Sequence, residues 1–424
     1  MQNVSGANRW ITLFVIIFAG EMVFSLPFHI VRYFRPTMLS VFDLSNTRLG
    51  DAIAVYGVMA MISYFPGGML ADRFPAGKMM AVSLFTTGLG GLYLYTIPGF
   101  TGLTLVFGFW GVTTIFLFWA ALIKATREWG GVLAQGRAFG FLDGGRGLIA
   151  AGAATVAVWL LGTFLNGTES ITSAKQLEAL KAIILFYVLF TILSGVLVWF
   201  AIPHKNESDK MPRQNPMKGL KAVLLTRVVW LQAFIVVSAY CGYKSLDYFS
   251  LYGIEYFNMD EVSAAGFVTY ASYLRALGAI GAGFLADRYT ASKVIIVTFI
   301  LLIISYMIPG FLIPQAKTVY LFFANMLFTF TAVYALRGVY FVLLEETQVK
   351  KQLTGTAVGL ISVIGYTPDV FFHSLAGRVL ESSPDGNGFQ RFFMLLLVIG
   401  LLGLLSSVLL LNIRKKRNTK PTAL

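Results

Sequence analysis

Charged residues and cysteines are scarce in this chain of 424 residues. Only 12% of the residues are Asp, Glu, Lys or Arg, about half of the share that soluble proteins carry. The single cysteine, Cys241, excludes an internal disulfide bond and a cysteine metal cluster. The chain also lacks a glycine loop ending in Gly-Lys-Ser, a two-His zinc signature and a Gly-x-Ser-x-Gly elbow. These absences argue against direct ATP use and against an enzyme, and we expect no cofactor.

Hydrophobic residues make up 57% of the chain and gather in long stretches. A helix that crosses a membrane needs about 20 mostly apolar residues. Stretches of this kind occupy residues 10–33, 48–71, 79–98, 101–124, 137–162, 181–202, 228–250, 263–286, 293–313, 318–344, 355–379 and 391–413. The sequence therefore predicts an all-α membrane protein with twelve transmembrane helices.

One short pattern occurs twice, as GMLADRFPAGK at residues 68–78 and as GFLADRYTASK at residues 283–293. Asp72 and Asp287 occupy equivalent places in the two copies, 215 residues apart (287 − 72). A second similarity links residues 136–140 to residues 355–359 at nearly the same offset. The repeat predicts two pseudo-symmetric six-helix bundles, the layout of solute carriers whose halves rock about a central site.

The longest polar stretch begins at Pro203 and separates the two copies. We expect an N-terminal bundle at 1–202, a cytoplasmic linker at 203–222, a C-terminal bundle at 223–413 and a basic cytoplasmic tail at 414–424. Lys and Arg gather in the linker, the hairpins and the tail, which all fall on one side, so both termini should be cytoplasmic. This bias and the cations within the spans account for the net charge of +13, and we expect no nucleic-acid partner.

The Gly-x-x-x-Asp-Arg hairpin after the second of twelve spans resembles the major facilitator superfamily. Three further segments are similar to its organophosphate:phosphate antiporter branch: residues 29–32 (HIVR), 140–146 (GFLDGGR) and 242–248 (GYKSLDY). The resemblance implies that Arg32 helps to bind an anion and that Arg146 stands at a histidine position of the pocket. The branch has an arginine where this chain has Gly242, with Lys244 two residues on, so a carboxylate or sulfonate is as admissible as a phosphate.

The repeated hairpins suggest a gate at the cytoplasmic side. Gly68 would let two helices pack closely, and Asp72 would accept N–H groups at the start of a neighbouring helix, where the dipole favours an anion. Arg73, Asp287 and Arg288 belong to the same predicted gate. The alternative is that the basic residues of the hairpins only anchor the topology.

Ionisable groups within spans cost several kcal/mol unless they face the bundle interior, so each one is a functional candidate. The predicted solute-binding cations are Arg32, Arg146, Lys244, Arg275 and Arg337, and the predicted aromatic lining residues are Trp119 and Tyr243. Guanidinium groups grip carboxylate, sulfonate or phosphate with paired donors. The alternative is that these cations pair with acids inside the membrane, as Lys244 could with Asp247 three residues away.

The same spans contain acids that could carry a proton. Buried carboxyl groups have raised pKa values and can shuttle a proton between two faces. The predicted coupling residues are Glu21, Asp369, Asp247 and His373, and the last lies four residues after Asp369 on one helical face. The alternative for each acid is a fixed counter-ion to an arginine. We interpret His29 as a residue of the membrane interface.

These features predict a secondary active transporter that moves a small phosphorylated, sulfonated or carboxylated metabolite across the cytoplasmic membrane by alternating access. Its driving force would be proton symport or anion exchange. The alternatives are a proton-driven drug efflux pump, which the sign of the cavity charges disfavours, and a non-transporting sensor with a carrier fold. We expect a monomer in the inner membrane whose partners are lipid, the anionic solute and, in the case of symport, protons.

Overall fold

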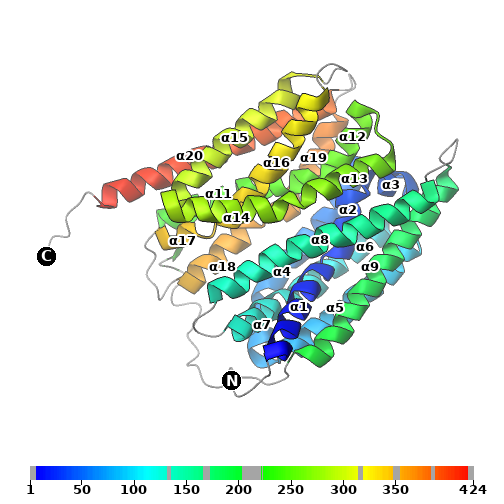
Figure 1. The fold of residues 1–424 in the computed structure, drawn as a ribbon, viewed down its shortest axis with the longest axis horizontal. Coiled ribbons are helices and arrows are strands. Elements are labelled where there is room, and N and C mark those ends of the chain that lie inside the picture. The colour runs from blue at the N-terminus through cyan, green and yellow to red at the C-terminus, as the bar shows by residue number, and fades with distance from the viewer. Residues whose placement is uncertain are drawn as a thin grey trace. The chain divides into compact units, whose positions relative to one another are not determined.

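The computed structural model describes residues 6–130, 135–165, 172–202, 221, 223–313, 319–346, 354–382 and 387–418, and these are mostly helical (Figure 1). In chain order, the helices of the first half are α1 (Gly6–Met22), the π-helix η1 (Ser25–His29), α2 (Ile30–Tyr33), α3 (Arg35–Val41), α4 (Asn46–Arg73), α5 (Ala76–Tyr95), α6 (Phe100–Val112), the π-helix η2 (Thr113–Trp119), α7 (Ala120–Gly130), α8 (Gln135–Leu165) and α9 (Ser173–Ala201). Those of the second half are α11 (Arg227–Ser245), the 3₁₀ turn η4 (Leu246–Tyr248), α12 (Phe249–Phe257), α13 (Glu261–Ser272), α14 (Leu274–Tyr289), α15 (Ala291–Phe311), α16 (Val319–Val339), α17 (Leu343–Glu346), α18 (Thr354–Gly365), α19 (Pro368–Glu381) and α20 (Gly388–Asn418).

Several helix ends follow directly from local sequence. The hydroxyl of Ser45 accepts a hydrogen bond from the backbone N–H of Arg48 and caps α4. The carboxylate of Asp260 caps α13 in the same way. Asn258 ends α12 in a left-handed conformation (φ 51°), which asparagine tolerates better than most residues. These caps set where the chain turns between helices.

Length and apolar character alone identify six membrane-spanning helices in the described part of the chain. The number rises to seven if Arg9–Met22 and Ser25–Tyr33, which meet at 42°, form one bent span. The other expected spans are also helical where they are described. Some are interrupted, as span seven is at η4 and span eleven at residues 366–367. Others, such as α5, contain glycines, threonines and a lysine that lower their mean hydropathy.

The helices of the two sequence repeats pack in equivalent pairs. α5 packs along α9 and α15 packs along α20, while α4 packs along α6 and α14 along α16. α15 begins 215 residues after α5 (291 − 76), and α20 begins 215 residues after α9 (388 − 173). The repeat predicted from two short patterns therefore extends to the packing of whole helices.

The chain divides into two compact units, which are described separately below. Unit 1 comprises Met1–Met211 together with Asp247–Tyr273 and Asp369–Gly377, and unit 2 comprises Pro212–Leu246, Leu274–Pro368 and Arg378–Leu424. Two segments of the second repeat thus fold with unit 1. The division into bundles at 203–222 stays a prediction, since nearly all of that linker lies outside the described residues. α20 continues to Asn418, so the basic residues 414–417 of the expected tail are helical.

Close approach of helices in unit 1 depends on particular glycines. A Cβ atom at Gly111 of α6 would lie 2.4 Å from the carbonyl oxygen of Tyr56 in α4, and one at Gly67 would lie 2.8 Å from that of Phe116. A Cβ atom at Gly68 would meet nothing within 4 Å. The packing role predicted for Gly68 is therefore wrong in this conformation, because Gly67 faces the neighbouring helix instead.

Replacing Gly111 by Ala should destabilise the protein by about 1–3 kcal/mol, because the added methyl group overlaps backbone that cannot rotate away. The measurement is the midpoint of thermal unfolding of the purified protein in detergent. Gly152→Ala in α8 is the matched control, since a Cβ atom at this position has no neighbouring atom within 4 Å. Equal midpoints for the two variants would contradict this account of the α4–α6 contact.

Candidate functional site

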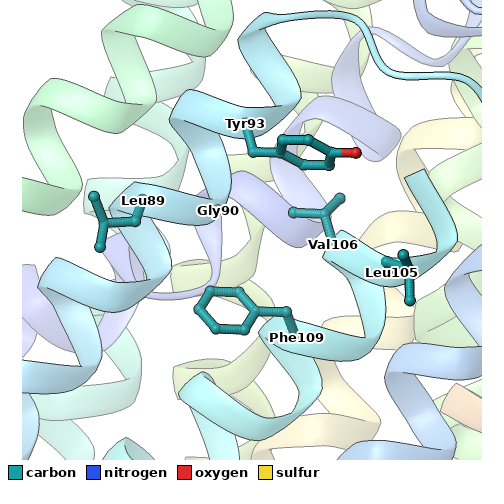
Figure 2. A pocket seen from close by; sticks show the side chains of 6 residues that line it. All are labelled: Leu89, Gly90, Tyr93, Leu105, Val106 and Phe109. Carbon is teal, nitrogen blue, oxygen red and sulfur yellow. The ribbon is translucent and has the colours of Figure 1, made fainter. Parts of the chain in front are cut away.

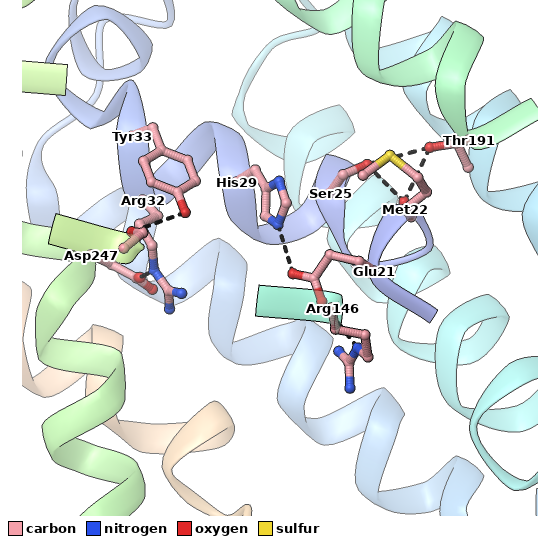
Figure 3. Close-up of polar contacts among 10 residues, drawn as sticks. Glu21, Met22, Ser25, His29, Arg32, Tyr33, Arg146, Thr191 and Asp247 are labelled. Carbon is pink, nitrogen blue, oxygen red and sulfur yellow. Dashed lines mark hydrogen bonds and ion pairs between the residues drawn. The ribbon is translucent and has the colours of Figure 1, made fainter. Parts of the chain in front are cut away.

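A buried carboxylate, imidazole and guanidinium meet inside unit 1 (Figure 3). Glu21 is 4% exposed and its two carboxylate oxygens have different partners. His29 Nε2 lies 3.1 Å from Oε1, and Arg146 Nε donates to Oε2 at 3.0 Å. The guanidinium of Arg146 also lies 5.4 Å from the ring centre of Phe24. We call Glu21, His29 and Arg146 the Glu21 triad.

The break after α1 explains how residues eight apart in sequence come into contact. In a regular α-helix their Cα atoms would be about 12 Å apart along the axis. Here the chain bends by 42° and continues as the π-helix η1, and His29 lies at the end of that π-helix. The carbonyl oxygen of Met22 accepts hydrogen bonds from Ser25 Oγ (2.7 Å) and Thr191 Oγ1 (3.1 Å) (Figure 3). Hydroxyl groups therefore satisfy a backbone group at the break, as a helix inside a membrane requires.

The position of His29 corrects its interpretation as a membrane-interface residue. The side chain is buried at 4% exposure and packs edge-on against the rings of Tyr33 and Tyr187. Its Nδ1 atom has no hydrogen-bond partner among the described residues. His29 therefore belongs with Glu21 and Arg146, and regular helical spacing could not have revealed the contact.

A second ionic cluster in unit 1 joins Arg32 to Asp247 (Figure 3). Arg32 Nε lies 2.5 Å from Asp247 Oδ1, and the exposed fractions of the two side chains are 7% and 0%. His373 Nε2 lies 3.5 Å from the other carboxylate oxygen, and the Tyr248 hydroxyl lies 3.3 Å from His373 Nδ1. Arg32 thus pairs with Asp247 and Arg146 with Glu21, and a role of either cation in binding solute stays a prediction.

The expectation that Lys244 and Asp247 lie on one helical face is wrong, because α11 ends at Ser245 and Asp247 lies in the 3₁₀ turn that follows. The expected relay from Asp369 to His373 stays a prediction. Both residues lie on α19 and both are buried, at 7% and 1% exposure.

Arg35 is a buried cation that the sequence analysis missed. It is fully buried, its Nε donates to Asn46 Oδ1 at 2.8 Å, and its guanidinium lies 3.9 Å from the ring centre of Tyr248. Its two terminal nitrogens have no hydrogen-bond partner among the described side chains. Arg35 follows the expected end of span one by two residues, so it was not among the charges predicted to lie within spans.

Unit 2 contains a group of cations and aromatic rings that we call the Tyr243 cluster. The guanidinium of Arg337 in α16 lies 3.8 Å from the ring centre of Tyr243 and 5.9 Å from that of Tyr240. Lys244, at 1% exposure, has its Nζ 5.3 Å from the ring of Tyr240. The rings of Tyr240 and Tyr243 stack with centres 5.8 Å apart. The structure thus brings together three predicted binding residues, Tyr243, Lys244 and Arg337.

The remaining predicted binding residues lie elsewhere within the two units. Trp119 is half-buried and packs edge-on against Phe24, the ring that also faces Arg146. Arg275 is 6% exposed on α14 in unit 2. Within the described ranges, no three His, Cys, Asp or Glu side chains gather closely enough to hold a metal ion.

The two repeated hairpins are held at their helix ends by different residues. Lys124 Nζ donates to the carbonyl oxygens of Ala71 (2.8 Å) and Phe74 (3.2 Å), so a cation satisfies the C-terminal end of α4. The side chain of Asp72 lies outside the described residues. Arg73 is exposed. The gate role of these residues stays a prediction.

In unit 2, Glu346 is the acidic residue that contacts the N-terminal end of a helix, α15. It accepts hydrogen bonds from the backbone N–H groups of Ala291 (2.5 Å) and Ser292 (3.3 Å) at the start of α15, and an ion pair from Arg414. Asp287 and Arg288, the predicted gate residues of this hairpin, are exposed at the end of α14. The favourable position at a helix N-terminus is therefore filled by a residue that the motif does not contain.

An apolar pocket of about 260 Å³ lies between α5 and α6 (Figure 2). Its lining residues are Leu89, Gly90, Tyr93, Leu105, Val106 and Phe109. Four of them are exposed large hydrophobic residues. The pocket contains no charged side chain, so it does not suit an anionic solute.

The chain is similar to known membrane proteins over most of its length. Residues 10–373 match the family model described as Major Facilitator Superfamily. The chain is 29% identical over 414 residues to the inner membrane protein YihN of Escherichia coli (strain K12), with 96% of each chain covered. It is 28% identical over 401 residues to the inner membrane protein YqcE of the same organism, covering 92% of this chain and 91% of the relative.

A solved structure shares the fold over nearly the whole chain. It is a bacterial homolog to the human lysosomal transporter Spinster, in an inward-facing and occupied conformation. The TM-score is 0.77 at 13% identity, over 99% of this chain and 100% of that one. Together with the family match, this likeness confirms the predicted all-helical fold class of two repeated bundles.

Replacing Glu21 by Gln should destabilise the protein by about 3–5 kcal/mol, because the buried Arg146 loses its carboxylate. The double variant Glu21→Gln/Arg146→Met should lose less than the sum of the two single variants. The measurement is a double-mutant cycle of unfolding midpoints in detergent, with the exposed Glu178→Gln as a control expected within about 0.5 kcal/mol of the parent. Strict additivity would show that Glu21 and Arg146 are not coupled in energy.

Proposed function

Because the chain belongs to the Major Facilitator Superfamily and is a secondary transporter rather than an enzyme, we propose that it carries a small organic anion by alternating access. The anion would be a phosphorylated, sulfonated or carboxylated metabolite. We further propose an inner-membrane location with both termini in the cytoplasm. The relatives named inner membrane proteins support the location, and the Lys and Arg bias supports the orientation.

The Tyr243 cluster carries the proposal of an anionic solute. Arg337 lies 3.8 Å above the face of Tyr243, next to the buried cation Lys244. Stacking uses the face of the guanidinium, whereas its five N–H donors lie in its plane and suit the paired oxygens of a carboxylate, sulfonate or phosphate. The rings of Tyr240 and Tyr243 offer an apolar surface for the rest of the solute.

The Glu21 triad supports coupling of the anion to a proton. In the structure Arg146 Nε donates a hydrogen bond to Glu21. An anion that recruits Arg146 must compete with this carboxylate, and protonation of Glu21 removes the competitor. His29 lies 3.1 Å from the same carboxylate and provides a second protonatable group. Anion and proton would therefore bind together, which is the thermodynamic requirement for symport.

Anion exchange is the second candidate for the driving force. It would need the same cations, but the protonation state of Glu21 would stay constant through the cycle. Drug efflux would need an acidic cavity for a cationic drug, whereas the Tyr243 cluster is cationic. A sensor with this fold would bind the anion without counterflow across a membrane.

Replacing Arg337 or Arg146 by Ala should reduce solute uptake by roughly 10- to 150-fold, the value of one hydrogen-bonded charge. A thermal-shift screen of phosphorylated, sulfonated and carboxylated metabolites would first select the solute, and uptake into proteoliposomes would then be measured. Arg227→Ala removes an exposed cation of α11 and should transport like the parent. Full transport by both Arg337→Ala and Arg146→Ala would remove these residues from the site.

Replacing Glu21 by Gln should abolish accumulation driven by a pH gradient but preserve counterflow of solute between the two faces. The amide cannot release a proton, so the coupled step is lost while exchange of bound solute continues. Asp369→Asn tests the other buried acid in the same assay. If both variants retain pH-driven accumulation, the proton assignment is wrong and anion exchange takes its place.

A further inference from the structure

Arg32 and Asp247 occupy equivalent positions of the two sequence repeats. They are 215 residues apart, the offset that also separates Asp72 from Asp287 and the start of α5 from that of α15. The following dipeptide, Tyr-Phe, occurs at both places, as residues 33–34 and 248–249. The structure therefore joins two repeat-equivalent positions by an ion pair between opposite charges.

Equivalent positions can contact each other only where the two repeats face each other across their symmetry relation, as in an isologous interface. Arg32 lies at the end of span one, and Asp247 lies in the turn that interrupts span seven. Both belong to unit 1. By the Lys and Arg bias, this end of the unit faces outward. The pair thus joins the outer ends of the first helix of each repeat.

Other contacts at the same end of unit 1 also link the two repeats. The Tyr33 hydroxyl donates to Ser272 Oγ at 3.2 Å. Further hydrogen bonds connect Thr37 with Glu261 and Ser374 with Asp51. Each bond joins a residue of the first repeat to a segment of the second, so the junction does not depend on a single pair.

Glycines bring the backbones of α4 and α19 into direct contact beside these bonds. A Cβ atom at Gly57 would lie 2.3 Å from the carbonyl oxygen of Asp369, and one at Gly50 would lie 2.3 Å from that of His373. A Cβ atom at Gly377 would lie 2.6 Å from the backbone of Thr47. A methyl group does not fit at any of these points, so the backbones of α4 and α19 are in close contact at this end of unit 1.

The interior of this junction is charged and incompletely hydrogen-bonded. Arg35 stacks on Tyr248 with both terminal nitrogens buried and without hydrogen-bond partners in the described part of the chain. Leaving such donors unsatisfied costs free energy in the closed state. A transporter that alternates must reopen its closed face, and an interface with this cost opens more readily than an apolar one.

From these observations we propose that Arg32 and Asp247 form the ion pair that closes the outer face during transport, with Arg35 positioning Tyr248 beside it. Arg32 then acts in closure rather than as a ligand of the solute. This inference goes beyond the proposed function, because it holds for any solute and any driving force.

A charge exchange tests this proposal directly. Arg32→Asp and Asp247→Arg each place like charges together, so each single variant should leave the outer face open. The double variant Arg32→Asp/Asp247→Arg restores opposite charges and should close it again. The neutral variants Arg32→Gln and Asp247→Asn serve the same test if a reversed charge prevents folding.

Closure is read from a cysteine reporter and needs no solute. Cys241 is the only cysteine, so Cys241→Ser with Ser250→Cys gives one thiol at a buried residue whose hydroxyl lies 3.5 Å from the carbonyl oxygen of Arg32. A membrane-impermeant maleimide added outside intact cells should label the single variants roughly a hundredfold or more faster than the parent, because breaking a buried pair strongly destabilises the closed state. The double variant should return to within a few-fold of the parent rate.

Glycine variants supply an uncharged comparison. Gly57→Ala should also speed labelling, because the added methyl group holds α4 and α19 apart. Gly140→Ala should not, because its added methyl group has no neighbouring atom within 4 Å. The proposal is overturned if the single charge variants label as slowly as the parent, or if the double variant labels as fast as they do. If labelling recovers in the double variant but uptake does not, Arg32 binds solute as well, and its assignment to closure alone is wrong.

Discussion

The cost of placing a charge in the apolar interior of a membrane protein is the constraint on which this structure depends. Glu21 and Asp247 are almost completely buried, and each has an arginine on one carboxylate oxygen and a histidine near the other. A buried pair of this kind is tolerable because the partners offset each other's desolvation. It is also easily perturbed, because a proton on the acid releases the arginine. The same contacts can thus hold the fold and respond to a solute.

The two acid-centred clusters and the Tyr243 cluster differ in the groups that surround their cations. In unit 1 the cations pair with acids. An anion must therefore compete with these carboxylates for the cations, or bind once a carboxylate is protonated. In unit 2, Lys244 and Arg337 lie against the rings of Tyr240 and Tyr243. We propose that the Tyr243 cluster, in which two cations lie against aromatic rings, makes first contact with the anion, and that the Glu21 triad provides the coupling.

Much of the fold could be predicted from the sequence, because long apolar stretches and a repeated hairpin are local signals. The apolar stretches predicted the helical segments, and the 215-residue offset predicted helices that pack in equivalent pairs. The contacts of the site were harder to foresee. The contact between Glu21 and His29 depends on a π-helix and a bend, which no regular periodicity reveals. Arg35 lay just beyond the expected span, and Gly67 rather than Gly68 proved to face the neighbouring helix.

The proton linked to anion binding provides the most direct test of the central claim, which is that buried arginine–acid pairs exchange their acid for a solute anion. Titration calorimetry of the purified protein with the anion that gives the largest thermal shift, repeated in buffers of different ionisation enthalpy, counts protons taken up on binding. Uptake of about one proton per anion is expected at a pH between the pKa of the acid in the free protein and its pKa in the anion complex, since binding favours the protonated acid. Binding of cations in preference to anions, or anion binding with no proton uptake at any pH, would contradict it.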